Sequence, residues 1–227
     1  MPFQPTLYHS RIYRDFKAIE INEYKRIVRF YEKYEQKILG LEFEEYFEML
    51  VRYANSLFQA GEYQKHLMMA DSIIETSILQ NIRVVEGEEI YRSTLFKKAA
   101  SYYNLLEYGR AIHILQELVK MEPNNELNIR FLEKCFQNEH PNALRKSAAA
   151  SIFLLLMAAA IVCIELVIVR NFYKPYVHIV EILRNTTFIF GCITLVGGRV
   201  YHYWSAHRKV TKFVAQARTS KKTAYYS

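Results

Sequence analysis

The stretch that decides the fold is residues 147–169, SAAASIFLLLMAAAIVCIELVIV, which has 23 residues and one charged side chain, Glu165. As an α-helix it would extend about 34 Å, enough to cross a hydrocarbon layer about 30 Å thick. We therefore expect this stretch to be a membrane-spanning helix.

Residues 184–204 form a second, weaker candidate span. The charge-free run within it, 185–198, covers only about 21 Å. A full crossing therefore requires the Arg199 side chain to extend toward the nearer headgroups. Aromatic residues gather where both spans should leave the membrane, as in an interfacial belt: Phe172, Tyr173, Tyr176, Tyr201, Tyr203 and Trp204. The sequence predicts a transmembrane helical hairpin over 141–205.

The net charge of +7 is unevenly divided along the chain. Residues 1–140 carry a net charge of −3, whereas 141–227 carry +10. Because the basic excess belongs to the membrane half, it favours contact with anionic lipid and argues against nucleic-acid binding. The predicted tail, 206–227, has one apolar face among its basic residues: Val210, Phe213, Val214 and Ala217. This pattern is typical of a helix on a membrane surface, and a solvated tail is the alternative.

The positions of the basic residues predict the orientation of the hairpin. Eight Lys/Arg flank the spans on the side that holds both termini, and three lie on the connecting side. By the positive-inside bias, both termini and the N-terminal domain should face the cytoplasm or a matrix-equivalent compartment. The three cysteines form no disulfide framework, which agrees with a reducing compartment. No cleaved signal is expected, because the first residues lack an apolar segment.

Residues 1–140 are expected to form an all-α domain. Apolar residues recur at helical spacing, beginning with Ile21, Tyr24, Ile27, Val28 and Tyr31, and no alternating strand pattern competes with them. Glycine, asparagine and proline interruptions divide the region into about six helices of about 12 to 20 residues.

One segment of this domain, 93–125 (STLFKKAASYYNLLEYGRAIHILQELVKMEPNN), resembles a tetratricopeptide repeat, a helix-turn-helix unit of 34 residues. The matching positions are Leu95, Tyr102, Leu105, Tyr108, Ala111, Leu115, Leu118 and Pro123. Ala99 and Leu106 depart from the family, which prefers glycine at both positions, and Leu118 replaces a small residue.

A looser second unit contains Leu50, Ala54, Leu57, Gly61 and Tyr63, but His66 stands where the family has alanine. The two units lie 45 residues apart, measured from Gly61 to Leu106, so the array should be irregular. Residues 126–138 and 20–38 are expected to cap its two ends.

The resemblance implies a groove for a peptide or partner helix, lined by the first helix of each pair. Its expected partner-binding residues are Asn55, Phe58, Tyr103, Asn104, Arg130 and Lys134, and Val51, Gln59, Phe96 and Ala100 lie at neighbouring groove positions. The alternative is that the aromatic members only pack against adjacent helices. The polar members favour the groove, because packing does not require their polarity.

Within the spans, Glu165 lies one turn from the far end of the first helix, in reach of Arg184, Asn185 or Thr186. We expect it to clasp the hairpin, and an ion or proton path or a contact with another subunit are the alternatives. Small residues recur in the second span at Gly191, Thr194 and Gly198, and Ala159 and Cys163 form a smaller set in the first. Such faces allow helices to approach closely.

Catalytic motifs are absent from the sequence. It contains no glycine-rich phosphate loop, Cys-x-x-Cys, His-Glu-x-x-His or Gly-x-Ser-x-Gly, and its seven histidines are scattered. We therefore expect no enzyme, cofactor or metal site. The sequence favours a membrane-anchored helical-repeat adaptor that recruits or assembles a protein partner. A homo-oligomeric membrane effector or pore, and an accessory subunit of a larger membrane complex, are the alternatives.

Overall fold

The computed structural model describes residues 10–85, 87–139, 141–169 and 174–226, and it confirms the all-α prediction. The chain divides into two compact units. The first contains Met1–Cys135 and Ala217–Ser227, and the second contains Phe136–Gln216.

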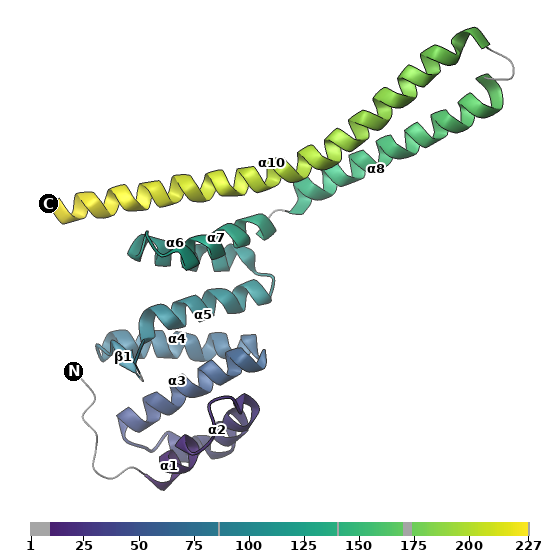
Figure 1. Cartoon of the computed structure of the whole chain (residues 1–227). Helices are drawn as coiled ribbons and strands as arrows, with labels where there is room; N and C mark the ends of the chain where they lie inside the picture. Colours follow the sequence, from purple (N-terminus) through teal and green to yellow (C-terminus); the bar gives the residue numbers. More distant parts are fainter. Residues whose placement is uncertain (1–9, 86, 140, 170–173, 227) are drawn as a thin grey trace. The chain divides into compact units, whose positions relative to one another are not determined.

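The first unit is a stack of helices in which each packs against the next in sequence from α2 to α6 (Figure 1). The helices are α1 (Arg11–Lys17), α2 (Tyr24–Ile38), α3 (Phe43–Ala60), α4 (Tyr63–Leu79), α5 (Ile90–Asn104), α6 (Tyr108–Met121) and α7 (Glu126–Glu139). Consecutive antiparallel helices bury one apolar stripe from each partner, which accounts for the spacing in the sequence. The fully buried side chains include Phe16, Ile27, Phe47, Leu57, Ile73 and Leu115.

The turns inside the two helix pairs both need a residue with positive φ. Gly61 ends α3 with φ of 82°, and Leu106 follows α5 with φ of 63°. Glycine adopts this left-handed conformation freely, whereas the Cβ of leucine crowds the backbone there. Leu106 is therefore strained at the position where the tetratricopeptide family has glycine.

We expect Leu106→Gly to raise the free energy of unfolding by about 0.5 to 1 kcal/mol, because relief of left-handed strain exceeds the entropy that glycine adds to the unfolded chain. The Leu106 side chain is 71% exposed, so little packing is lost. Denaturant unfolding of the full chain in mild detergent measures the effect. Leu106→Ala keeps the strain and is the control. An equal gain from both substitutions would show that the leucine side chain, and not its φ, is responsible.

A short β-ribbon between α4 and α5 was not expected from the sequence. Strand β1 (Val84–Val85) pairs antiparallel with β2 (Glu88–Glu89), and Gly87 between them has φ of 84°. Strands of two residues are too short to produce an alternating apolar pattern, which explains why the region appeared only as a break between helices. The ribbon places Glu88 beside α5.

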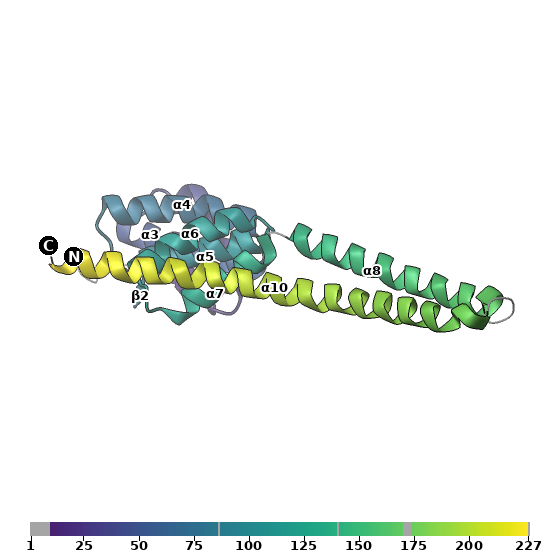
Figure 2. The same ribbon diagram turned by 90° about the horizontal axis from the view of Figure 1, so that it is seen from above.

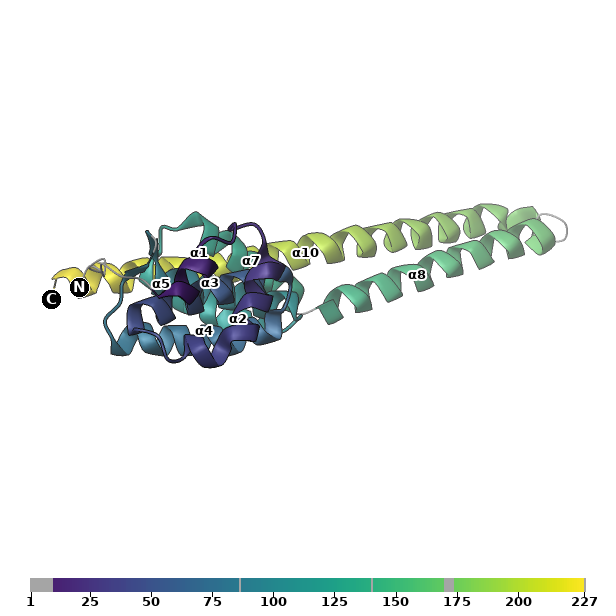
Figure 3. The same cartoon turned by 90° about the horizontal axis from the view of Figure 1, so that it is seen from below.

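The second unit contains the hairpin. Helix α8 (Pro141–Ile164) continues into a π-helical turn (Glu165–Val169), and α10 (Val177–Tyr226) follows a 3₁₀ turn (Lys174–Tyr176). Figures 2 and 3 show α8 beside the first part of α10. By length and composition, two helical segments of the described chain could cross a membrane, Leu144–Val169 and Val177–Lys222.

The helix boundaries differ from those expected for the second span and the tail. Helix α10 begins at Val177, before the expected start at 184, and continues without a break past 205. No glycine or proline follows Gly198, so nothing in the sequence ends the helix at the expected span boundary. The expected tail is therefore the last part of α10. Of the expected aromatic belt, Phe172 and Tyr173 lie outside the described residues.

Candidate functional site

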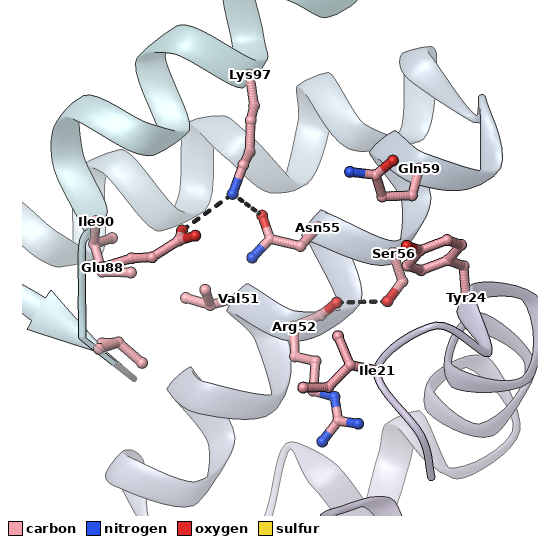
Figure 4. A pocket seen from close by; sticks show the side chains of 11 residues that line it. Ile21, Tyr24, Val51, Arg52, Asn55, Ser56, Gln59, Glu88, Ile90 and Lys97 are labelled. Atoms are coloured by element: carbon pink, nitrogen blue, oxygen red, sulfur yellow. Dashed lines mark hydrogen bonds and ion pairs between the residues drawn. The ribbon is translucent and has the colours of Figure 1, made fainter.

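A cavity of about 290 Å³ lies where α3 and α5 meet the β-ribbon and the segment between α1 and α2 (Figure 4). Its walls combine apolar and polar side chains, in contrast to the apolar core beside it. The lining residues are Ile21, Tyr24, Val51, Arg52, Asn55, Ser56, Gln59, Val85, Glu88, Ile90 and Lys97. Three of the predicted groove positions, Val51, Asn55 and Gln59, therefore line one cavity.

Lys97 is the central cation of this cavity. Its Nζ donates to Asn55 Oδ1 at 2.9 Å and to Glu88 Oε2 at 3.2 Å, so it connects α3, α5 and the β-ribbon (Figure 4). An ammonium group has three N–H donors, and these contacts use two of them. The third donor and the amides of Asn55 and Gln59 can donate hydrogen bonds to carbonyl or carboxylate oxygens.

Arg52 has a structural role at the edge of the same cavity. It is buried, it donates through Nη2 to the carbonyl oxygen of Ile19, and its guanidinium lies 5.3 Å from the centre of the Phe16 ring. These contacts fasten the segment between α1 and α2 to α3. Arg52 Nε is buried and has no hydrogen-bond partner among the described residues.

A buried polar pair joins α4 to α5. The His66 ring nitrogen Nδ1 lies 2.8 Å from Ser101 Oγ, and both residues are buried. Burial lowers the pKa of His66 from 6.5 to about 4, and the positive charge of Lys97 acts in the same direction. His66 is therefore neutral in the folded protein at physiological pH.

A second surface lies between α5 and α7. Phe131 on α7 contacts two α5 rings, Phe96 at 5.5 Å and Tyr103 at 5.5 Å between ring centres. The Lys134 ammonium lies 5.1 Å from the centre of the Tyr103 ring. An open depression of about 480 Å³ beside these rings is lined by Phe96, Glu126, Leu127, Arg130, Phe131 and Lys134. Arg130 is exposed there and pairs with Glu126 at 2.8 Å.

The predicted partner-binding residues thus separate into different environments. Asn55 lines the polar cavity, whereas Tyr103, Arg130 and Lys134 belong to the α5–α7 surface. Phe58 packs against Tyr63 and His66 between α3 and α4, with ring centres 5.9 and 5.4 Å apart, which matches the packing alternative. Asn104 is exposed at the end of α5 and lines neither depression.

Sequence reasoning missed Lys97 and Glu88. Lys97 precedes Ala100 and Asn104 by three and seven residues, so the helical spacing that selected those two could have selected it as well. Glu88 could not have been found in this way, because its position depends on the β-ribbon.

In the hairpin, the structure brings together Glu165 and Arg184. Arg184 Nη1 donates to Glu165 Oε2 at 2.8 Å, and Glu165 is fully buried while Arg184 is partly exposed. Arg184 also donates to Asn185 Oδ1. A buried carboxylate requires such a partner, because an unpaired charge in apolar surroundings is costly. This pair ties the π-helical turn to α10.

The predicted small-residue set of the second span faces α8. A Cβ atom added to Gly191 would lie 3.2 Å from Leu155 Cδ2, and one added to Gly198 would lie 2.4 Å from Ser147 Oγ. Thr194 between them is half-buried, whereas Ala159 and Cys163 of α8 are exposed. The close approach of the two helices therefore depends on Gly191 and Gly198.

We expect Gly198→Ala to destabilise the hairpin by about 1 to 3 kcal/mol through overpacking, because the added Cβ would also lie 2.7 Å from Ser147 Cβ, which rotation cannot move away. Gly197→Ala is the matched control, since its added Cβ has nothing within 4 Å. Unfolding of the full chain by SDS in mixed micelles measures the difference. Adding Ser147→Gly to Gly198→Ala should restore stability, and equal losses at 197 and 198 would contradict this packing.

The described residues contain no group of three or more His, Cys, Asp or Glu side chains that could hold a metal ion. Comparisons with known proteins found no match to the chain among protein-family models, curated proteins or solved structures. The tetratricopeptide resemblance therefore stays a prediction that rests on the residues described above.

Proposed function

We propose that this protein is a membrane-anchored adaptor, in which the helical stack recruits or assembles a protein partner and the hairpin fixes it at the membrane. The observation that carries the proposal is the cavity around Lys97. Asn55 and Glu88 hold the Lys97 ammonium inside a cavity that is lined by amide and apolar groups. The cation would orient a bound peptide segment, and the apolar walls would bury part of its surface. The aromatic and basic α5–α7 surface would extend the contact area, since such side chains are enriched at interfaces.

Two features support the anchoring role. The helical segments Leu144–Val169 and Val177–Lys222 include stretches that are long and apolar enough to cross a membrane. Large apolar side chains on them are exposed, including Phe153, Leu156, Phe190 and Val196. Such an extent of exposed apolar surface is unfavourable in water, whereas lipid around the two helices would cover it.

For the orientation, we expect both termini to lie on the cytoplasmic or matrix-equivalent side, because the basic residues concentrate there. Single cysteines at Lys174 and Lys222, in a chain without its native cysteines, test this in intact cells. A membrane-impermeant maleimide should label Lys174→Cys from outside, and should label Lys222→Cys only after permeabilisation. The reverse pattern would contradict the orientation.

Partner binding is tested with a photo-crosslinking amino acid at Gln59, which lines the cavity and is exposed. We expect an adduct with a discrete protein in native membranes, and Lys97→Met should reduce its yield at least tenfold. Lys98→Met is the matched control, because Lys98 neighbours Lys97 but pairs with Asp71 on α4. The same crosslinker at Glu75, exposed on α4, should not form this adduct.

The outcome also separates the alternatives. An adduct that forms equally well in Lys97→Met would contradict recruitment through the cavity. An adduct only between copies of this chain, together with a homomeric ring in mild detergent, would favour the oligomeric effector. A fixed heteromer that survives the Lys97→Met change would favour an accessory subunit held through other surfaces.

A further inference from the structure

A small depression lies on α10 just beyond the apolar run of the second candidate span. Its volume is about 210 Å³, and all of its lining residues belong to this one helix: Tyr201, Trp204, Ser205, Arg208, Lys209 and Lys212. These positions recur at intervals of three and four residues, so they form one face of the helix. This cationic face combines two aromatic side chains with three cations.

The cationic face carries positive charge without an acidic counterpart. No Asp or Glu follows Glu181 in the sequence, and in the described part of the chain no carboxylate pairs with Arg208 or Lys212. Arg208 instead stacks on the indole ring of Trp204, with its guanidinium carbon 3.7 Å from the ring centre. A stacked guanidinium keeps N–H donors around its edge, and these donors fit two oxygens of a phosphate group.

The same face of α10 continues into the apolar run. Phe190, Ile193 and Gly197 lie on it at helical spacing. The two large side chains are exposed, and a Cβ atom added to Gly197 would have nothing within 4 Å. Ile193 and Arg208 are 15 residues apart, which is about 22 Å along the helix. One leaflet with its headgroups is about 20 to 22 Å thick, so this stretch matches the length of one lipid molecule.

The direction of the side chains brings the cations toward the apolar run. Side chains of an α-helix point back toward its N-terminus, and in α10 the apolar run lies on the N-terminal side of Arg208 and Lys212. The stacking of Arg208 on Trp204 follows this direction, because Trp204 lies one turn nearer to the apolar run. The two cations can therefore reach a headgroup layer at the depth that tryptophan prefers.

The cationic face is not the face that the sequence assigned to the membrane surface. Val210 and Val214 belong to that apolar face, and both are buried in the structure. Each residue turns an α-helix by about 100°, so Arg208 and Lys212, each two positions from Val210, lie about 200° around the helix from it. Both cations are exposed. They therefore lie on the side of α10 opposite the buried apolar side chains.

We propose that the cationic face of α10 binds the headgroup of one anionic phospholipid. Arg208 and Lys212 bind the phosphate oxygens, and the Trp204 ring packs beside the headgroup. An acyl chain lies along the apolar stripe from Phe190 to Gly197. Anionic lipids are concentrated in the cytoplasmic leaflet, the side on which we expect both termini. The inference rests on the anchoring part of the proposed function and does not depend on partner recruitment.

The fluorescence of Trp204 tests this site, because Trp204 is the only tryptophan of the chain. The full chain is reconstituted into vesicles of phosphatidylcholine and phosphatidylglycerol, and one lipid at a time carries brominated acyl chains, which quench tryptophan on contact. We expect phosphatidylglycerol to be preferred about fivefold or more, since each cation near anionic lipid contributes about that factor. Arg208→Gln with Lys212→Gln should reduce the preference to less than about twofold.

Arg145→Gln with Lys146→Gln is the matched control. It removes two exposed cations from the start of α8, at nearly the same depth, because the next residue, Ser147, lies against Gly198 of α10. This variant should keep the preference for phosphatidylglycerol. An equal decrease in both double variants would mean that the basic surface attracts anionic lipid diffusely, and it would overturn a discrete site.

The quenching also separates this site from the proposed anchoring. Equal quenching by the two lipids would overturn the site and leave anchoring intact, whereas no quenching by either lipid would contradict both. Quenching by brominated phosphatidylcholine shows that each variant is still inserted. An excess of inorganic phosphate should not change the preference, and loss of the preference on its addition would indicate a site for free phosphate instead of a lipid.

Discussion

Glu165→Leu should destabilise the hairpin by about 3 kcal/mol, the lower end of the range for breaking a buried ion pair. The fully buried carboxylate accepts from Arg184 Nη1 at 2.8 Å, and its removal leaves the guanidinium without its carboxylate partner. The loss should not reach the upper end of the range, because Arg184 is partly exposed and keeps its contact with Asn185. SDS unfolding of the full chain in mixed micelles measures it.

Two further variants identify the cause. Glu165→Gln keeps an oxygen that can accept from Arg184, so its loss should be smaller. Glu165→Leu with Arg184→Leu removes both charges and should recover most of the stability, because an ion pair replaced by apolar residues of similar size often costs little. If the double variant is as unstable as Glu165→Leu, the pair is not what holds the π-helical turn to α10.

The hairpin shows what could be predicted from sequence. The rise per residue of a helix placed Glu165 near the far end of the first span, within reach of Arg184. Small residues at helical spacing similarly identified the face of α10 that meets α8. The length of α10 could not be predicted in this way, because basic residues mark a membrane boundary without ending a helix. Val210 and Val214 are buried in the structure, and an amphipathic pattern alone does not reveal whether lipid or protein covers its apolar face.

The residues of the polar cavity were also only partly predictable from the sequence. Helical spacing placed Asn55 on a face of α3 that lines the cavity. Its partner Lys97 lies 42 residues away, however, and is held by Glu88 from a ribbon without a sequence signature. Phe58 was chosen by the same spacing, yet it packs between α3 and α4, because aromatic rings serve packing and binding equally well. His66 appeared only as a departure from the alanine of the repeat family. In the structure its ring contacts Ser101, a partner that pairwise spacing within one helix cannot show.

The buried histidine His66 should make the folded domain sensitive to acid. The His66 pKa is about 4 in the folded protein and 6.5 as its ordinary value, so between these pH values the unfolded chain binds a proton that the folded protein does not. The contribution of neutral His66 to the free energy of unfolding is therefore complete above about pH 6.5. It decreases as the pH falls and is lost below about pH 4. The free energy of unfolding should decrease by about 3 kcal/mol over this pH range.

The contribution of His66 is isolated by comparing stability curves between pH 7.5 and 4, measured by urea unfolding followed by circular dichroism on the full chain in mild detergent. His66→Ala with Ser101→Ala removes both polar partners, so this variant should lose less stability than the wild type as the pH falls, whatever its stability at neutral pH. His113→Ala, at an exposed position on α6, should keep the wild-type pH dependence. Parallel curves for the wild type and the double variant would mean that His66 becomes protonated without unfolding, and that the α4–α5 interface can accommodate the charge.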